Sequence, residues 1–403
     1  MKGLRFRGLF LGSALALAAC GSGAKNDGGS AGANGSAGAA DTAGANGSAG
    51  ATDTAGANGS AGAGASGSAG ASDTAGASGS AGATDAATTG TAGDGGGADA
   101  TGVPSATTGT QDDPGTTGDG TVPLPGPYTL PPEATSHLNG APTGQLLGPF
   151  THKLTGTYTG WSASWIFTYW VYVPTQYKAG HRAALAVFGD GEHYIGMPAL
   201  SDARFNAPTV FDNLIADGSM PVTIGVFIYP GSSMGQIVGG GDGGRSKQYD
   251  TPNDQYGKFL LQEFLPNEIL NKYDIVTDAD GWAIGGHSSG GIAAFSAAWF
   301  YTDNFHKVIT ASPSFSNTGG YFPAKILTVT PAKPIRVYHL AGTNDLCCPS
   351  WYDENNTAAK DFMMMSYHYR YRPGTGMHFP PAEGAQDFPD ALRWLWRGYH
   401  TSP

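Results

Sequence analysis

Short apolar runs recur along the C-terminal two thirds of the chain, and most of them stop at a proline, a glycine or a polar turn. Most of these runs are apolar throughout rather than alternating, which is typical of strands covered on both faces in a parallel sheet. The runs predict strands over residues 165–173, 183–188, 222–229, 282–284, 307–311, 335–340 and 367–372.

Between these runs, apolar positions follow the spacing of one helix face. They predict helices over residues 209–217, 254–273, 290–301, 355–365 and 388–399, the second of them bent or interrupted at Pro266. Repeated alternation of strand and helix indicates an α/β fold with a mostly parallel central sheet and helices on both faces. Ligands of such sheets bind at the carboxyl ends of the strands.

The apolar pattern is missing from residues 21–127, which contain no aromatic residue. The unit Ala-Gly-Ala-Asn-Gly-Ser-Ala-Gly-Ala begins at Ala31 and again at Ala43 and Ala55. Such a segment buries too little apolar surface to offset the entropy of ordering it, so we expect a disordered tether rather than a stacked repeat array. The folded domain is then 128–403, and a fragment beginning near Tyr128 is expected to fold.

Residues 1–20 have the pattern of an export signal. A basic start is followed by the apolar stretch 9–19. The stretch closes on Leu-Ala-Ala before Cys20, which resembles the bacterial lipobox, where the cysteine becomes a lipidated N-terminus. An ordinary secretory signal is the alternative. Acyl chains on Cys20 would hold the exported protein on a membrane, and Gly21 in place of an aspartate favours the outer membrane or the cell surface.

Charge and composition exclude several classes of function. The chain has 21 Lys and Arg against 32 Asp and Glu, a net charge of −11, and no basic stripe, so no nucleic-acid partner is expected. It has no uninterrupted apolar run near the length of a membrane-spanning helix. No His or Cys spacing of metal-ligand type is present, and we expect neither a metal nor another cofactor.

The candidate nucleophile is identified by its context. Gly-x-Ser-x-Gly occurs at 28–32, 231–235 and 286–290, and in a chain with 64 glycines the pattern alone says little. The motif carries chemistry only on a sharp turn from a strand into a helix. Only the third copy lies between a predicted strand and helix, while the copy around Ser233 runs into a glycine-rich segment that cannot start a helix. Ser288 is therefore the predicted nucleophile, against the alternative of a plain glycine turn.

A nucleophilic serine needs a base and an acid that orients the base. Asp345 follows one late strand directly, and His378 lies in a glycine-rich loop after the next strand. These two are the predicted acid and base, with Asp353 and Glu354 as alternatives for the acid. The other histidines of this region lie on the turn or on strands, where packing is the expected role: His287, His339 and His368.

Residues 182–396 resemble the family called Putative esterase, a branch of the α/β-hydrolases. This family includes enterochelin esterases, esterase D, feruloyl and acetyl xylan esterases, and mycolyltransferases. The resemblance is carried by Gly285-Gly286-His287-Ser288-Ser289-Gly290-Gly291, by Gly342-Thr343-Asn344-Asp345-Leu346 and by Pro389-Asp390-Ala391-Leu392-Arg393-Trp394-Leu395-Trp396.

The resemblance implies an α/β-hydrolase fold and a triad of Ser288, Asp345 and His378. It also implies an oxyanion hole formed by the backbone N–H groups of Ser289 and Glu192. The chain departs from the family in the Gly-Thr-Gly-Met loop before the histidine, and it has Gln248 where a glutamate is common.

Further side chains lie in loops near the predicted site. Cys347 and Cys348 follow Asp345 closely, and either a bridge between the two neighbours or two free thiols is compatible with the sequence. The residues that could contact an acyl or sugar group of the substrate are His193, Tyr194, Arg245, Trp351 and Tyr352.

Together these features predict a carboxylic ester hydrolase that works through an acyl-enzyme, on the cell surface or in the periplasm. Its substrate is expected to be an acyl, feruloyl or acetyl ester of a carbohydrate, or a siderophore-type ester. Two alternatives stay open. One is an acyltransferase of the same fold, similar to the mycolyltransferases, and the other is a non-catalytic binding lipoprotein.

Overall fold

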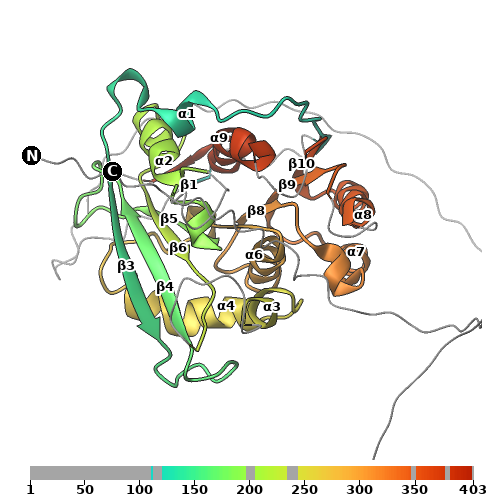
Figure 1. The fold of residues 1–403 in the computed structure, drawn as a ribbon, viewed down its shortest axis with the longest axis horizontal. Helices are drawn as coiled ribbons and strands as arrows, with labels where there is room; N and C mark the ends of the chain where they lie inside the picture. Colours follow the sequence, from blue (N-terminus) through green and yellow to red (C-terminus); the bar gives the residue numbers. More distant parts are fainter. Residues whose placement is uncertain are drawn as a thin grey trace, which may run out of the picture. The chain divides into compact units, whose positions relative to one another are not determined.

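A mostly parallel sheet runs through the centre of the protein (Figure 1). The structure is a computed structural model, and it describes residues 110–111, 120–196, 205–233, 244–345, 351–376 and 382–401. Within these residues, nine strands pair in the order β2-β10-β9-β8-β7-β5-β6-β4-β3. All neighbours from β2 to β6 are parallel, whereas β4 and β3 are antiparallel additions.

The strands of this sheet have the following bounds: β2 Gly120–Thr121, β3 Gln145–Lys153, β4 Ile166–Val173, β5 Ala184–Gly189, β6 Thr223–Ile228, β7 Trp282–His287, β8 Lys307–Ala311, β9 Arg336–Gly342 and β10 His368–Gly374. A separate antiparallel pair joins β1 (Thr110–Gln111) to β11 (Tyr399–His400).

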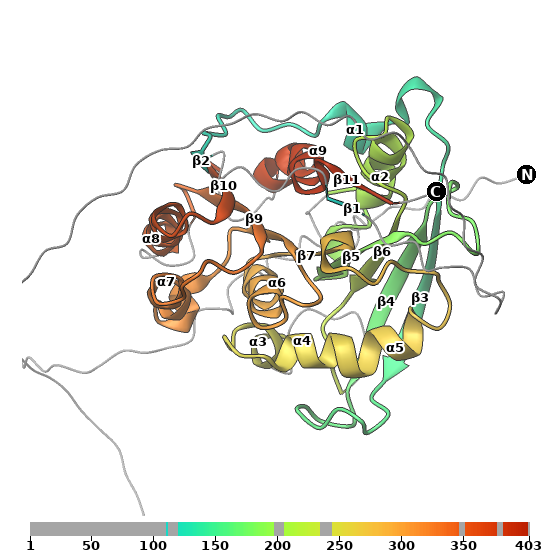
Figure 2. The same ribbon diagram turned by 180° about the vertical axis from the view of Figure 1, so that it is seen from behind.

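Helices cover both faces of the sheet (Figures 1 and 2). On β5, Leu185 and Val187 pack into a core with α4, α5, α6, α7 and α8, while Ala186 and Phe188 pack into a second core with α1, α2 and α9. The bounds are α1 Pro132–Thr135, α2 Ala207–Ala216, α3 Gly244–Tyr249, α4 Gln255–Phe259, α5 Leu265–Glu268, α6 Ser289–Phe300, α7 Tyr321–Ile326, α8 Trp351–Met364 and α9 Ala382–Trp396. The predicted fold class is confirmed.

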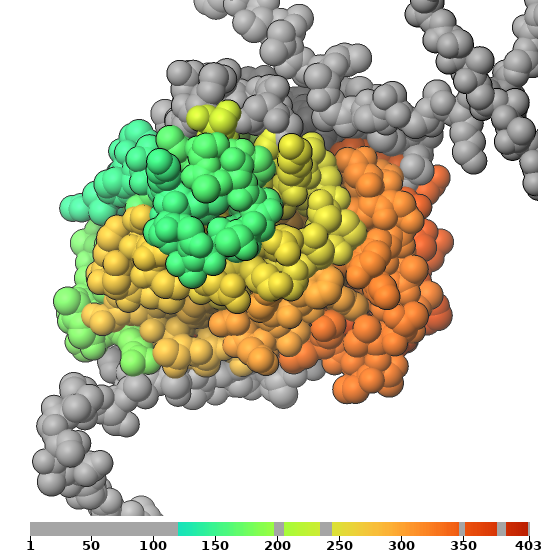
Figure 3. Space-filling view, turned by 90° about the horizontal axis from the view of Figure 1, so that it is seen from below, coloured from blue at the N-terminus to red at the C-terminus, as the bar shows by residue number. Residues whose placement is uncertain are grey.

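The predicted helix over 254–273 is interrupted, as expected from Pro266. α4 runs into a π-helical turn, Leu260–Phe264, in which the Leu265 N–H donates to the carbonyl of Leu260. α5 then begins with Pro266 in its first turn. Because proline has no N–H and cannot donate to the preceding turn, the wider turn sits where the regular ladder would break. Figure 3 shows this segment, in yellow, beside the β3–β4 hairpin, in green.

β3 is a strand that the apolar pattern does not predict. It forms one edge of the sheet, and Leu146 and Phe150 are 37% and 41% exposed. Its pairing with β4 shifts register between Leu147 and Phe150, around Pro149. An exposed strand needs no continuous apolar run, and a proline with a bulge at an edge discourages pairing with another chain.

The sheet includes residues on the N-terminal side of Tyr128. β2 lies along β10, and beyond it the N–H groups of Val122 and Leu124 donate to the carbonyls of Tyr371 and Pro373, both at 2.8 Å. Leu124 is buried. A fragment that begins at Tyr128 lacks this edge strand. The expectations for the signal peptide, for Cys20 and for the tether up to residue 109 concern residues outside those described.

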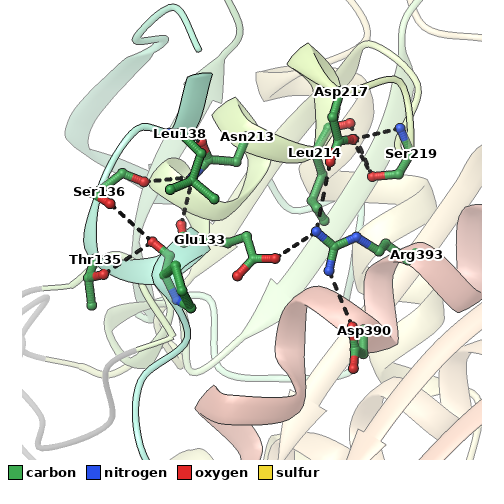
Figure 4. A network of polar contacts seen from close by, with 11 residues as sticks. Glu133, Thr135, Ser136, Leu138, Asn213, Leu214, Asp217, Ser219, Asp390 and Arg393 are labelled. Atoms are coloured by element: carbon green, nitrogen blue, oxygen red, sulfur yellow. Dashed lines mark hydrogen bonds and ion pairs between the residues drawn. The ribbon is translucent and has the colours of Figure 1, made fainter. Parts of the chain in front are cut away.

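Hydrogen bonds and an ion pair join the segment after Tyr128 to α2 and α9 (Figure 4). The side-chain amide of Asn213 donates to the carbonyls of Glu133 (2.9 Å) and Ser136 (2.8 Å), and its oxygen accepts the Leu138 N–H at 2.7 Å. Arg393 of α9 pairs with the Glu133 carboxylate at 2.7 Å. Burial alone would raise the pKa of Glu133, but the hydrogen bond from Arg393 lowers it overall. The segment after Tyr128 is therefore an integral part of the domain.

Candidate active site

Ser288 stands at the sharp turn between β7 and α6. Its backbone has φ 61° and ψ −128°, a conformation that residues with a side chain rarely adopt. Its N–H donates to the carbonyl of Ala311, at the end of β8, at 2.9 Å. This bond holds the strained turn against the neighbouring strand, and Ser288 is 8% exposed.

The glycines around Ser288 are required for close packing. A Cβ atom at Gly286 would lie 2.1 Å from the carbonyl oxygen of Gly290, and one at Gly290 would lie 2.8 Å from Oδ2 of Asp190. Both distances are shorter than any ordinary contact, so neither position accepts a side chain without a shift of its surroundings. The Gly-x-Ser-x-Gly pattern at this position thus has a steric cause, which a chance glycine-rich sequence would not have.

The other two copies of the pattern have different surroundings. Residues 28–32 lie outside the described part of the chain. Ser233 follows β6 and an antiparallel bridge between Ser232 and Ile166, residues 234–243 lie outside the described part of the chain, and the next described helix is α3, from Gly244. Ser288 is therefore the one serine of the three that is seen on a turn from strand to helix.

The predicted oxyanion loop follows β5, which pairs directly with β7. Asp190 has a left-handed backbone, and Gly191 packs so closely on β6 that a Cβ would lie 2.5 Å from the carbonyl carbon of Phe227. Within the 3-10 turn Gly191–His193 that follows, the bonded N–H groups are those of His193 and Tyr194. The N–H of Glu192 thus has no carbonyl partner in its own turn, although it interacts with the carboxylate of its own side chain.

The first N–H groups of any helix also lack a partner within the helix, and Ser289 is the first residue of α6. Donors of this kind, on two adjacent loops at the carboxyl edge of the sheet, are what an oxyanion hole needs. This arrangement is compatible with the sequence-based choice of Ser289 and Glu192.

The loop after β9, which carries Asp345, is hydrogen bonded to the loop after β10. The N–H groups of Thr343 and Asn344 donate to the carbonyls of Gly374 (3.0 Å) and Gly376 (3.2 Å). The side-chain amide of Asn344 also donates to the carbonyl of Thr375 at 2.6 Å. These bonds bring the half-buried Asp345 next to the segment that leads to position 378, which itself lies outside the described residues.

The alternative acids lie on α8. Asp353 is exposed, and the carboxylate of Glu354 points toward the loop before α7, where a Cβ at Gly320 would lie 3.5 Å from Oε2. Both residues are in the first turn of the helix. Among the described residues, hydrogen bonds join the loop of Asp345 to the loop after β10 and none joins Asp353 or Glu354 to it, so Asp345 remains the better candidate.

Burial of the predicted substrate-contacting residues varies. Tyr194 is fully buried, and its ring stacks on Phe205 at a centroid distance of 4.4 Å. Trp351 is also buried, and its indole N–H donates to the carbonyl of Ser312 at 3.3 Å. These contacts favour packing roles for Tyr194 and Trp351, whereas Tyr352 is half-buried.

His193 and Arg245, the other two predicted substrate-contacting residues, lie around the predicted oxyanion loop. The ring of His193 lies 6.4 Å from that of His287, the residue before Ser288, and its Nε2 is 3.6 Å from Oε1 of Glu192. Arg245 binds Asp190 through two hydrogen bonds. Burial, reinforced by the charge of Asp190, raises the pKa of the Glu192 carboxyl well above its ordinary value.

The histidines assigned to packing are held by hydrogen bonds on the strands. His339 is buried between the Tyr369 hydroxyl and Oδ1 of Asn355, each at 2.7 Å. Burial lowers its pKa to about 4, so the ring is neutral at physiological pH. His368 accepts a hydrogen bond from Nε of Arg336 at 3.1 Å. Packing is thus the role that these contacts indicate.

The expectations for Cys347 and Cys348 fall outside the described residues. In the part of the chain that the structure covers, His, Cys, Asp and Glu side chains form no group of three or more that could hold a metal ion. Among the helices of the same part, none combines the length and apolar character that a membrane span requires.

A mostly parallel sheet with a serine on the turn between a central strand and its helix defines an α/β-hydrolase. Within this class, the chain belongs to the family described as Putative esterase, whose model matches residues 163–369, about half of the chain. The matched region contains Ser288 and Asp345 and ends before His378.

Solved structures of esterases share the fold. The ferric enterobactin esterase of Salmonella typhimurium is 17% identical over 67% of this chain and 62% of its own, with a TM-score of 0.50. The enterobactin esterase of Shigella flexneri is 19% identical over 63% of this chain and 59% of its own, with a TM-score of 0.47. A feruloyl esterase module of Clostridium thermocellum is 13% identical over 71% of this chain and 98% of its own, with a TM-score of 0.47.

The chain spans less than two thirds of the length of these two enterobactin esterases. No curated protein matches it by sequence.

Proposed function

We propose that this protein is a carboxylic ester hydrolase in which Ser288 is the nucleophile, His378 the general base and Asp345 the acid that orients the base. The observation that carries the proposal is the strained backbone of Ser288 between β7 and α6, with glycines in close contact on both sides. A serine held in this way presents its hydroxyl at the carboxyl edge of the sheet. Membership of the esterase family supports the same class of reaction.

In the first half of the proposed reaction, Oγ of Ser288 attacks the carbonyl carbon of the ester, and its proton passes to the imidazole of His378. The carbonyl oxygen becomes an oxyanion that accepts hydrogen bonds from the N–H groups of Ser289 and Glu192. The bond to the leaving alcohol then breaks, and His378 returns the proton to that oxygen. The products are the free alcohol and an acyl ester on Ser288.

Water completes the cycle. His378 takes a proton from the water as its oxygen attacks the acyl carbon, and the bond to Oγ of Ser288 breaks. The proton returns to Oγ, and the carboxylic acid leaves. The proposed role of Asp345 is to hold the imidazole in one tautomer and stabilise its positive charge.

For the substrate we propose an acyl, feruloyl or acetyl ester of a carbohydrate, or a siderophore-type ester. The names of the fold relatives include enterobactin and feruloyl esterases, which represent two of these ester classes. Hydrolysis by the full mature chain of a panel of p-nitrophenyl, feruloyl and acetylated-sugar esters tests this choice. The pattern of rates against acyl size reports the size of the acyl pocket.

We also propose that the protein is exported and anchored at the outer membrane or cell surface through a lipid on Cys20, with the repeat-rich segment as its tether. The support is the sequence of the first twenty residues and of the segment after them. Cys20→Ser is expected to abolish incorporation of labelled fatty acid and to move the protein out of the membrane fraction. A Cys20→Ser protein that still takes up fatty acid would contradict the anchor.

Covalent trapping tests the proposed chemistry directly. A fluorophosphonate probe reacts with an activated serine, and peptide mass spectrometry identifies the modified residue. We expect one adduct, on Ser288, and loss of esterase activity in proportion to labelling. Labelling of a different serine, or inactivity toward every ester of the panel, would contradict the proposal.

A further inference from the structure

One short helix, α3, touches the loops that follow three neighbouring strands at the carboxyl edge of the sheet. These strands are β5, β6 and β7, and the first and third of these loops carry the proposed oxyanion donors. α3 lies close to α6 in both ribbon views (Figures 1 and 2). The contacts are Arg245 with Asp190, Gln248 with Gly231, and Asp250, directly after the helix, with Ser289.

The strongest of these contacts is a bidentate ion pair. Nε of Arg245 donates to Oδ1 of Asp190 at 2.8 Å, and an Nη2 hydrogen goes to Oδ2 at 2.6 Å. Asp190 is 1% exposed, so its carboxylate is shielded from solvent. Burial by itself lowers the pKa of Arg245, but the neighbouring charge of Asp190 outweighs it and raises the pKa overall. Only the planar fork of an arginine makes both bonds at once.

Asp190 connects this ion pair to the proposed oxyanion hole. It lies two residues before Glu192, in the left-handed conformation that turns the chain out of β5 (φ 50°, ψ 51°). Its Oδ2 lies against Gly290, in the first turn of α6, and its N–H donates to the hydroxyl of Tyr249 at 3.3 Å. One carboxylate therefore touches both the loop after β5 and the helix that begins at Ser289.

The charge of Arg245 also acts on Asp250, which interacts with the hydroxyl of Ser289. Burial raises the pKa of Asp250, while the hydroxyl of Ser289 and the charge of Arg245 lower it. The same guanidinium thus favours the ionised form of Asp250, the group that interacts with the Ser289 side chain. The guanidinium therefore pairs directly with Asp190, and its charge also acts on Asp250.

We propose that Arg245 is a positioning residue that fixes the N–H groups of Glu192 and Ser289 relative to one another through Asp190. This inference rests on the proposed function. It differs from the sequence-based expectation that Arg245 contacts the substrate, because Nε and Nη2 of the guanidinium already bind Asp190. The role predicts a specific kinetic signature.

The oxyanion forms only in the tetrahedral intermediate and the transition states on either side of it, so displaced donors lower kcat and leave substrate binding nearly unchanged. Loss of a single oxyanion donor costs roughly 10²- to 10³-fold in kcat, and a misplacement near 1 Å costs roughly 10²-fold. An arginine that bound the substrate would instead raise KM when removed. The split between kcat and KM therefore separates the two roles.

The experiment compares Arg245→Met, Arg245→Lys and Asp190→Asn in the full mature chain, with p-nitrophenyl acetate as the substrate. Arg245→Met is expected to lower kcat by roughly 10²-fold, with KM little changed, and Arg245→Lys to recover part of the loss. The double variant Asp190→Asn/Arg245→Met should be no slower than the slower single variant, because both changes break one interaction. Arg393→Met is the matched control, since it removes the ion pair between Arg393 of α9 and Glu133 of α1 and should leave kcat unchanged.

Unchanged kcat in Arg245→Met would overturn the inference, and so would a raised KM at unchanged kcat. If Arg245→Met does not fold, as judged by near-UV circular dichroism, the same criteria apply to Arg245→Lys, which keeps the charge. A wild-type chain that hydrolyses no ester would contradict the proposed function itself, so the two failures are distinguishable.

Discussion

The hydroxyl oxygen of Tyr128 accepts a hydrogen bond from the backbone N–H of Thr375 at 2.6 Å, three residues before His378. The same hydroxyl donates to the carbonyl of Leu124 at 3.0 Å. The end of the repeat-rich segment is thereby joined to the loop after β10. The segment that would connect the domain to the membrane also supports the loop that leads to the proposed base.

We therefore predict that truncation at Tyr128 impairs catalysis. A chain beginning at Pro104 keeps β1 and β2, whereas one beginning at Tyr128 loses both and should have a lower kcat and a lower melting temperature. Tyr128→Phe in the full chain removes the acceptor for the Thr375 N–H and should cost about 1 kcal/mol of unfolding free energy. Equal kcat and stability of the two truncated chains would show that the segment does not support the loop.

For the acid, Asp345→Asn is expected to lower kcat by roughly 10⁴-fold, because the imidazole loses the partner that fixes its tautomer. Asp353→Asn and Glu354→Gln are the matched controls on α8, and each should retain nearly full activity. Steady-state kinetics of the three variants decides the assignment. Near-normal turnover of Asp345→Asn together with loss of activity in one of the controls would move the acid to α8.

The hydrogen bonds of Gln248 explain why this chain has a glutamine where a glutamate is common in the family. Its amide nitrogen donates to the carbonyls of Gly231 (2.8 Å) and Gly244 (2.9 Å), and its oxygen accepts the Gly231 N–H at 3.0 Å. A glutamate cannot donate to two carbonyls, and an ionised one would be repelled by them.

Gln248→Glu is therefore predicted to destabilise the protein by about 1–3 kcal/mol at pH 7. The pKa of the introduced carboxyl should be raised in the folded state, so the loss should shrink as the pH falls below that raised value. Urea unfolding at pH 5 and pH 7 measures this difference, with Gln248→Ala as the control that lacks a titrating group. A loss that is the same at both pH values would contradict the account.

Lys307 is buried at the amino end of β8, between the rings of Trp396 and Tyr399 and beside the carbonyl of Asp280. Burial lowers its pKa from the ordinary 10.5 to about 7, with Asp280 opposing the shift. Between these values the unfolded chain holds a proton that the folded chain does not. Stability is thus lost as the pH falls from about 10.5 to about 7.

The wild-type unfolding free energy should accordingly rise by about 2 kcal/mol more than that of Lys307→Met between pH 7 and pH 9. Denaturant unfolding of both proteins at the two pH values gives the difference directly. Parallel pH profiles of the wild type and the variant would mean that Lys307 is protonated in the folded state.

The buried part of the fold could be predicted from the sequence, because apolar runs and helical periods record burial. β4 to β10 are central or covered strands, and each has such a run. β3 has none, since it lies at an exposed edge, and α3 was missed because it begins at the end of a glycine-rich segment. The strand β2 was missed because its two residues pair through backbone hydrogen bonds, which require no particular side chains and so give no pattern in the sequence.

The candidate site likewise has one part that the sequence predicts and one part that it does not. Ser288 could be found because its turn needs glycines at fixed positions, and the steric contacts of Gly286 and Gly290 supply the reason. The pair of Asp190 and Arg245 joins residues 55 positions apart, and it depends on how two loops meet in space. The sequence pointed to Arg245 as a residue near the site, but it does not specify the partner of Arg245.

The central claim is tested most directly by the turnover of Ser288→Ala beside Ser233→Ala, measured on the same ester with proteins of equal circular dichroism. Both serines belong to Gly-x-Ser-x-Gly, but within the described residues only Ser288 is placed on a turn from strand to helix. Removing the nucleophile of a triad costs roughly 10⁶-fold in kcat, so Ser288→Ala should be inactive while Ser233→Ala matches the wild type. A folded Ser288→Ala protein that still hydrolyses the ester at a comparable rate would contradict the account.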